Sequence, residues 1–250
     1  MGDHPTFEGK AACYAAGRKG YAQEVYDFIA SQAPAGEYPV AADMGSGTGL
    51  FAQGLLERGY AVLGVEPLAQ MREMAQDRLD SMVRYRAIPQ SAEQTGLDSG
   101  SIDLITAASA FHWFDWDRVR REWARILRPG GKVFVIQNYR VYEDELTKAQ
   151  HAACARYGKH FTSLNHGYEK VASGCEMFFA AKPTRVDIAF DQIYTAEQFI
   201  ARGLSSSYAP APGEDGYEGY RKGLQRIFDR FEEGGRVTMR NRTAIWCGTL

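Results

Sequence analysis

The sequence predicts an α/β fold built on a doubly wound, mostly parallel sheet with helices on both faces. Short apolar runs alternate with amphipathic helical patterns through the first half of the chain, which is the pattern of such a sheet. The run Val40-Ala41-Ala42 leads into a glycine-rich turn and then a helix, the order in which these sheets build nucleotide sites. A chain of 250 residues with 45% hydrophobic content can bury one sizeable core.

Strands of the first half are expected where apolar and β-branched residues cluster, at 40–43, 61–66, 83–87, 102–107 and 132–137. Helices are expected between them, at 21–32, 50–58, 67–79 and 117–127. Pro67 stands in the first turn of the third helix, where proline is tolerated. The sequence Arg128-Pro129-Gly130-Gly131 is a stop signal for the fourth helix.

The second half of the chain has a different pattern. The stretch 139–181 is polar and aromatic and lacks a strand pattern, so we expect helices there and interpret it as a cap or substrate-binding insertion. A strand at 186–194, helices at 196–204 and 217–233, and a last strand at 242–248 are expected to follow. The two late strands bring the sheet to seven and can close it in the antiparallel direction, within a single domain of residues 1–250.

Net charge, hydropathy and cysteine content argue against several classes of protein. The net charge of −2 gives no electrostatic reason to expect a nucleic-acid partner. Residues 1–10 lack an apolar signal core, and no later stretch is apolar enough to span a membrane. We therefore expect a cytoplasmic protein without a membrane partner, as a monomer or homodimer. The four cysteines are scattered, which favours reduced thiols over a disulfide or metal site, and they are Cys13, Cys154, Cys175 and Cys247.

Two further groups of residues have both a plain and a functional interpretation. A basic run could mark a polyanion partner, but it is interleaved with acids, which favours a solvated helix face; it comprises Arg118, Arg120, Arg121, Arg125, Arg128 and Lys132. Four tyrosines of the second half are candidates for lining a substrate pocket, with Tyr208 favoured: Tyr139, Tyr142, Tyr194 and Tyr208. Three histidines lack partners at metal-ligand spacing, so no metal is expected: His151, His160 and His166.

The glycine-rich turn from Asp43 to Gly49 indicates the class of ligand. The dinucleotide fingerprint, started at Gly45, needs a third glycine where this chain has Leu50. Asp43 would also repel a pyrophosphate bound at the turn. A ligand without phosphate that carries positive charge fits better, and S-adenosylmethionine (SAM), with its ammonium and sulfonium groups, meets this description.

Three more segments are expected at the same edge of the sheet. Glu66 ends the second apolar run, about twenty residues after the glycine turn, where an acid accepts hydrogen bonds from ribose hydroxyls. Ser91-Ala92-Glu93 follows the third strand and can read an adenine. Ser109 begins an aromatic segment after the fourth strand that contains His112 and Trp113.

With these pieces the chain resembles the class I SAM-dependent methyltransferases, in particular the small-molecule branch that includes trans-aconitate methyltransferase. The matching motifs are Asp43-x-Gly45-x-Gly47-x-Gly49, Gly64-Val65-Glu66-Pro67, Ser91-Ala92-Glu93, Ala110-Phe111-His112-Trp113-Phe114 and Leu127-Arg128-Pro129-Gly130-Gly131. The motif Tyr14-x-x-x-Arg18-x-x-Tyr21 resembles the branch's N-terminal element over the methyl donor, with Lys19 and Ala22 in place of its prolines. The resemblance implies a Rossmann-like methyltransferase fold that binds SAM and releases S-adenosylhomocysteine (SAH).

The resemblance implies a role for each matching residue. The expected cofactor-binding residues are Tyr14, Asp43, Gly45, Gly47, Gly49, Glu66, Pro67, Ser91, Ala92, Glu93, Ser109 and Trp113, and the expected catalytic residues are His112, Arg18 and Tyr14. His112 is either a general base or a structural residue beside Trp113. Arg18 holds either the cofactor carboxylate or an anionic substrate.

The expected function is methyl transfer to oxygen or nitrogen, less readily carbon, of a small organic molecule, and the resemblance favours a carboxylate. Two alternatives remain open at this point. The first is a non-catalytic regulator or scaffold that binds the cofactor on the same fold. The second is a nicotinamide-dependent oxidoreductase.

Overall fold

A computed structural model describes residues 19–32 and 39–250, and these residues divide into two compact units. The sheet unit comprises Gly20–Asn138, Gly167–Ile188 and Thr243–Leu250. The helical unit comprises Lys19, Tyr139–His166 and Ala189–Arg242. The expected insertion 139–181 is therefore divided, because residues 139–166 belong to the helical unit and 167–181 to the sheet unit.

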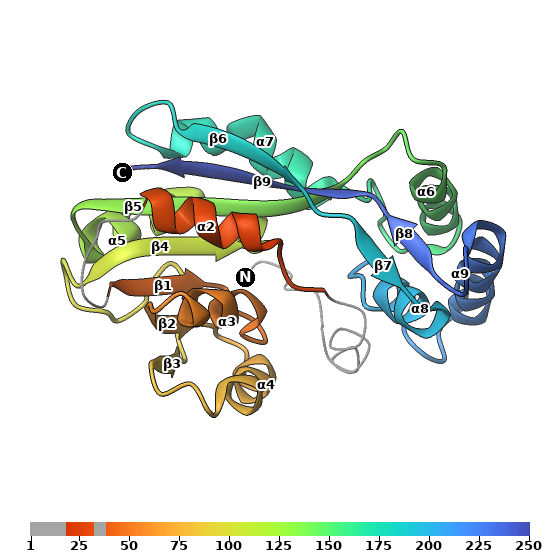
Figure 1. The fold of residues 1–250 in the computed structure, drawn as a ribbon, viewed down its shortest axis with the longest axis horizontal. Helices are drawn as coiled ribbons and strands as arrows, with labels where there is room; N and C mark the ends of the chain where they lie inside the picture. Colours follow the sequence, from red (N-terminus) through yellow and green to blue (C-terminus); the bar gives the residue numbers. More distant parts are fainter. Residues whose placement is uncertain (1–18, 33–38) are drawn as a thin grey trace. The chain divides into compact units, whose positions relative to one another are not determined.

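The sheet has seven strands, the number predicted, and their order is β3-β2-β1-β4-β5-β9-β6 (Figure 1). Their bounds are β1 Val40–Met44, β2 Ala61–Val65, β3 Tyr85–Ile88, β4 Ile102–Ala108, β5 Leu127–Arg140, β6 Thr184–Ala189 and β9 Asn241–Gly248. Strand β1 is parallel to both β2 and β4, and β2 and β4 are parallel to β3 and β5. Ala41, Ala42 and Met44 of β1 are fully buried, as expected for a central strand covered on both faces.

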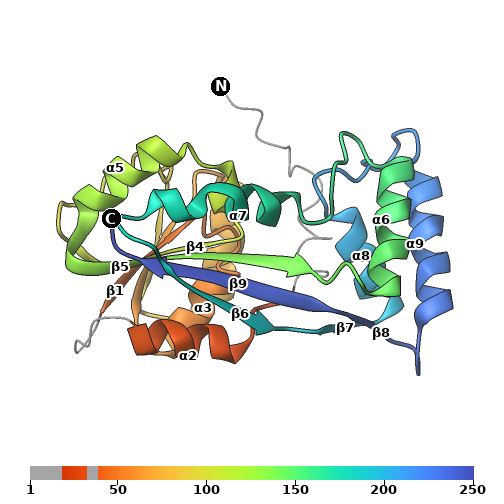
Figure 2. The same ribbon diagram turned by 90° about the horizontal axis from the view of Figure 1, so that it is seen from above.

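Helices cover both faces of the sheet, with α2 on one face and α5 and α7 on the other (Figure 2). In the sheet unit they are α2 Gln23–Gln32, α3 Leu50–Glu57, α4 Ala69–Leu79, α5 Trp116–Ile126 and α7 His166–Phe178, with a short 3₁₀ helix, η1, at Phe111–Trp113. Helix α5 begins where the Asp115 side chain accepts a hydrogen bond from the backbone N–H of Arg118 at 3.0 Å. This cap satisfies one of the free N–H groups at the start of the helix.

Strand β5 is longer than predicted at both ends. It begins at Leu127, directly after α5, and includes the segment 128–131 that was expected to be a turn. Leu127 pairs with Ile102, whereas the next pair is Lys132 with Leu104, so the extra residues of β5 are accommodated by an irregularity in the register. The stop signal thus ends the helix as predicted but lies within the strand.

The helical unit contains α6 Glu145–Tyr157, α8 Ala196–Leu204 and α9 Tyr217–Phe231. The single strand expected at 186–194 is wrong, because β6 ends at Ala189 and a separate strand, β7 Gln192–Tyr194, pairs antiparallel with β8 Val237–Met239. Strand β8 was not predicted. The core of this unit combines aliphatic and aromatic side chains, and its fully buried aromatic members include Tyr194, Phe199 and Tyr220.

Candidate functional site

The glycine turn between β1 and α3 has a backbone that glycine adopts easily. Gly45, Gly47 and Gly49 have φ values of +67°, +54° and +73°, in the left-handed region that other residues rarely enter. The backbone N–H of Gly45 donates to the carbonyl of Val65 at 2.8 Å, which attaches the turn to the end of β2. A Cβ atom on Gly45 would lie 2.7 Å from the Cβ of Ala110, so this position also requires glycine for packing.

Gly47 differs from its neighbours because the space beside it is open. A Cβ atom there would meet no other atom within 4 Å. Its N–H donates to Oε2 of Glu66 at 3.1 Å, so the turn and the acid at the end of β2 form one structure. The open space next to the backbone of Gly47 allows a ligand to approach the turn closely.

Asp43 and Glu66, at the carboxyl ends of β1 and β2, are both buried, with 1% and 7% of their surfaces exposed. Oδ1 of Asp43 accepts a hydrogen bond from the Thr106 hydroxyl at 2.7 Å. Oδ2 of Asp43 is buried and has no hydrogen-bond partner among the described residues. Oε1 of Glu66 accepts from the N–H of Leu68 at 2.9 Å. The edge therefore presents two acids, one with an unused acceptor.

Burial, and to a smaller extent the nearby charge of Glu66, raises the pKa of Asp43 to about 7, although the hydrogen bond from Thr106 lowers it. An unused carboxylate oxygen in a buried place is costly unless a donor or a cation meets it. The site is therefore suited to a ligand that brings an ammonium group or other hydrogen-bond donors.

Tyr85 lies close enough to Asp43 and Glu66 for their charges to affect its pKa, although no role was predicted for it. Burial raises the pKa of its phenol to about 12, and the charges of Asp43 and Glu66 contribute. A Cβ atom at Gly64 would lie 2.5 Å from the Tyr85 hydroxyl oxygen and 2.9 Å from Oγ of Ser46. Gly64, already part of a quoted motif, is thus required because two side chains fill its space.

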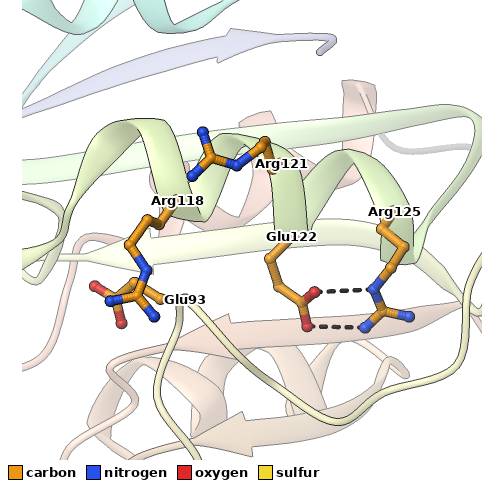
Figure 3. A pocket seen from close by; sticks show the side chains of 5 residues that line it. All are labelled: Glu93, Arg118, Arg121, Glu122 and Arg125. Atoms are coloured by element: carbon orange, nitrogen blue, oxygen red, sulfur yellow. Dashed lines mark hydrogen bonds and ion pairs between the residues drawn. The ribbon is translucent and has the colours of Figure 1, made fainter.

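The segment Ser91–Glu93 forms a tight turn after β3, in which the N–H of Gln94 donates to the carbonyl of Ser91 at 3.2 Å. The Ala92 carbonyl accepts from the indole N–H of Trp123 at 3.0 Å. Oε1 of Glu93 accepts from the N–H of Asp115 at 3.2 Å. Glu93 also lines a shallow pocket of about 240 Å³ beside α5, shown in Figure 3, together with Arg118, Arg121, Glu122 and Arg125.

Ser109, directly after β4, is one of two non-glycine residues with positive φ in the described ranges, at +54°. Its Oγ lies 3.0 Å from the Tyr21 hydroxyl. Tyr21 packs edge-on against Phe51 of α3, with ring centres 4.9 Å apart. Tyr21 therefore contacts residues at this edge of the sheet. It is the last residue of the motif Tyr14-x-x-x-Arg18-x-x-Tyr21, but no role was predicted for it.

His112 lies in η1 and packs against α7 within the sheet unit. A Cβ atom on Gly167 would lie 3.0 Å from Cε1 of His112, and the Lys170 ammonium donates to the His112 carbonyl. The aromatic residues on either side of His112 differ in how much of their surface is exposed. Phe111 is fully buried against Trp116 and Phe178, with ring centres 4.9 and 4.8 Å away, whereas Trp113 is 45% exposed. Phe111 is a core residue, and the roles of His112 and Trp113 stay predictions.

The remaining residues that were candidates for a functional role lie in different parts of the chain. Tyr14 and Arg18 lie outside the described residues. Pro67 follows Glu66 directly, and its carbonyl accepts from Arg72 at 2.7 Å. In the basic run, Arg125 pairs with Glu122 and Arg128 with Asp103, at 2.8 and 2.6 Å. The four tyrosines singled out in the second half all belong to the helical unit: Tyr139, Tyr142, Tyr194 and Tyr208.

No helix in residues 19–32 or 39–250 is both long and apolar enough to cross a membrane. The same residues contain no group of three or more histidine, cysteine, aspartate or glutamate side chains arranged to hold a metal ion.

Residues 42–135 match the model of a family described as "Methyltransferase domain". Uncharacterized methyltransferases of Mycobacterium bovis and Mycobacterium tuberculosis are 36% identical over 135 residues, or 54% of this chain and 53% of each relative. A methyltransferase-like protein of Schizosaccharomyces pombe is 29% identical over 139 residues, 55% of this chain and 53% of that protein. The chain spans about half the length of these curated relatives.

Solved structures share the fold over nearly the whole chain. A candidate type II methyltransferase from Anaeromyxobacter dehalogenans superposes with a TM-score of 0.66 at 22% identity, covering 93% of this chain and 97% of that one. A phosphoethanolamine N-methyltransferase of Haemonchus contortus, solved with SAH, superposes with a TM-score of 0.51 at 15% identity, covering 98% of this chain and 58% of that one.

Proposed function

We propose, from the methyltransferase domain that residues 42–135 carry, that this protein is a SAM-dependent methyltransferase. We propose further that it acts on oxygen or nitrogen of a small organic molecule, with a carboxylate-bearing acceptor favoured by the resemblance to the trans-aconitate branch. The observation that carries the proposal is the pair of buried acids, Asp43 and Glu66, around the open space at Gly47.

The residues at this edge suit SAM chemically. Oδ2 of Asp43 is a buried acceptor that lacks a partner in the described part of the chain, and SAM carries an ammonium group. Glu66, held by the N–H groups of Gly47 and Leu68, stands where an acid can accept from ribose hydroxyls. The H. contortus relative was solved with SAH bound, which supports the same cofactor here.

SAM supplies an activated methyl group whose sulfonium charge is lost on transfer. The protein's contribution is to align the acceptor and to exclude water, and alignment of this kind is worth about 7–11 kcal/mol in favourable cases. A carboxylate acceptor needs no base, whereas an alcohol, phenol or ring nitrogen benefits from one. In this proposal His112, beside the methyl-donor edge after β4, serves such an acceptor as the base.

Calorimetric titration with SAH tests the cofactor assignment. We expect Asp43→Ala and Glu66→Ala each to weaken SAH binding about tenfold or more, because each removes charge-assisted hydrogen bonds. Asp77→Ala is the matched control, since Asp77 is an exposed acid of α4 in the same unit. Affinities of both variants equal to that of the control would refute the assignment.

An acceptor screen with methyl-labelled SAM tests catalysis. We expect label to appear in a small molecule from a metabolite extract, and His112→Ala to lower turnover of acceptors that must lose a proton. A protein that binds SAH but labels no acceptor would be the non-catalytic regulator instead.

A further inference from the structure

Arg140, the last residue of β5, is a buried cation in the helical unit. Only 5% of its surface is exposed. Its backbone is held at both ends by one side chain, because Oδ1 of Asn165 accepts from its N–H at 2.8 Å and Nδ2 of Asn165 donates to its carbonyl at 2.9 Å. The guanidinium is oriented by α6, since Nη1 donates to Oε1 of the buried Gln150. The side chain is therefore fixed before any ligand arrives.

No acid of the described residues forms an ion pair with this guanidinium. The side chain to which the guanidinium donates, Gln150, is a neutral amide. The charged group with the largest effect on it is a second cation, because burial and then the charge of Arg202 lower the pKa of Arg140. Arg202 likewise forms no ion pair within the described part of the chain.

The other titratable groups around Arg140 do not supply a negative charge. Burial raises the pKa values of the Tyr208 and Tyr220 phenols and of the Cys154 thiol. The Tyr220 hydroxyl and the Cys154 sulfur are hydrogen-bonded to each other at 3.3 Å. The two phenols and the thiol are therefore neutral near pH 7.

A buried arginine without a counter-ion is rare for a physical reason. Arginine stays protonated in proteins, and a charge that is taken out of water without a partner costs several kcal/mol. Proteins that keep such a cation commonly use it for a ligand of opposite charge, and the planar guanidinium matches carboxylate and phosphate oxygens two at a time. A bound anion would thus act as the counter-ion that the described residues do not provide for Arg140.

We propose that the helical unit binds a small anion, a carboxylate or phosphate group, through Arg140, with Arg202 and the Tyr208 hydroxyl nearby.

Titration calorimetry on the full chain tests anion binding with inorganic phosphate, succinate and citrate as probes, against sodium chloride at matched ionic strength. We expect saturable binding of phosphate or of at least one carboxylate by the wild type, and which of them binds identifies the anion. If the wild type binds none of the three, the proposal is wrong.

Arg140→Met locates the site, with Arg226→Met as the matched control, because Arg226 is an exposed arginine of α9 in the same unit. We expect Arg140→Met to weaken anion binding about tenfold or more, because a charge-assisted hydrogen bond is lost, and Arg226→Met to bind as the wild type does. Without anions, Arg140→Met should melt no lower than Arg226→Met, because it removes an uncompensated buried charge. Anion binding by Arg140→Met equal to that of the control overturns the proposal.

Should Arg140→Met fail to fold, Arg202→Met takes its place, and unchanged anion affinity in that variant likewise overturns the proposal. SAH affinity, measured on the same samples, separates this proposal from the proposed function. We expect Arg140→Met to bind SAH as the wild type does. If the wild-type protein binds anions but not SAH, the anion site is supported and the proposal that the protein is a SAM-dependent methyltransferase is refuted.

Discussion

At the scale of single residues, the candidate cofactor site depends on how Asp43 is buried. Thr106 satisfies one of its oxygens, and the other has no partner among the described residues. Burial is the larger effect and raises the pKa of this carboxyl to about 7. Its charge is therefore sensitive to pH in the range where enzymes are assayed.

This burial predicts that SAH affinity depends on pH. Below a pKa of about 7 Asp43 is increasingly protonated in the free protein, and a neutral carboxyl attracts an ammonium group weakly. We expect the affinity to be constant above about pH 8 and to fall by up to about tenfold for each pH unit below 7. Calorimetry at a series of pH values measures this change. Asp43→Asn should bind weakly at every pH, and the same pH profile in this variant would contradict the prediction.

Two glycines allow backbone strain to be separated from ligand binding. Gly47 and Gly100 have φ values of +54° and +62°, and a Cβ atom on either would meet nothing within 4 Å. Alanine at either position should therefore cost a similar free energy of unfolding, about 1–2 kcal/mol. Only Gly47→Ala should also weaken SAH binding, because only Gly47 lies in the turn beside Glu66. Denaturant unfolding and calorimetry provide the two measurements, and equal SAH affinities in the two variants would disprove the role of the turn.

At the scale of elements, the turn is supported by the packing of α3. Gly49 begins this helix in a left-handed conformation, and a Cβ atom there would lie 2.8 Å from Cδ1 of Leu79 in α4. On the opposite side Tyr26 of α2 stacks on Phe51 of α3, with ring centres 5.0 Å apart. Helices α2 and α4 therefore both restrict where α3, and with it the turn, can lie.

Gly54, in the interior of α3, predicts an unusual mutational effect. Alanine is normally the better helix former, by about 1 kcal/mol. At this position, however, its Cβ would lie 2.2 Å from Cζ of Tyr26. We expect Gly54→Ala to lower the free energy of unfolding by about 1–3 kcal/mol through overpacking.

Gly223 of α9 is the control for this variant, because its nearest contact would be an ordinary 3.8 Å. Gly223→Ala should leave stability unchanged or raise it. Thermal and denaturant unfolding compare the two, and a Gly54→Ala protein as stable as Gly223→Ala would show that α2 and α3 are packed less closely than described.

At the scale of the whole molecule, the chain passes between the two units five times, after residues 19, 138, 166, 188 and 242. Neither unit is a continuous piece of sequence, so neither can be produced by simple truncation. The two proposed ligand sites nevertheless belong to different units, since Asp43 and Glu66 are in the sheet unit and Arg140 is in the helical unit.

Hydrogen exchange measured by mass spectrometry can locate both sites in the intact chain. We expect SAH to slow exchange in the peptides that contain 43–49 and 64–68, because their amide groups form or adjoin the turn. The anion that calorimetry identifies should slow exchange around Arg140 and α6 instead. Sodium chloride at matched ionic strength is the control. Protection by SAH of the helical unit alone would contradict the placement of the cofactor site.

The sequence by itself determined the fold class, the approximate positions of the first five strands along the chain, and the placement of Asp43, Glu66 and the glycine turn at strand ends. These features follow from local patterns, namely apolar runs, helix periodicity and glycine spacing, that span a few residues each. The seven-stranded sheet confirms that level of inference. The separation of β7 from β6, and its pairing with β8, was missed because strand pairing depends on residues distant in the chain.

Only the tertiary structure decided which side chains meet. Glu66 holds the N–H of Gly47, 19 residues away, whereas Thr106 reaches Asp43 over 63 residues and Tyr21 reaches Ser109 over 88. The lack of an ion pair between Arg140 and an acid of the described residues also depends on the tertiary structure, because it is set by all the residues that pack around the guanidinium. Burial and pairing of charge arise from contacts across the fold, and local sequence patterns do not contain them.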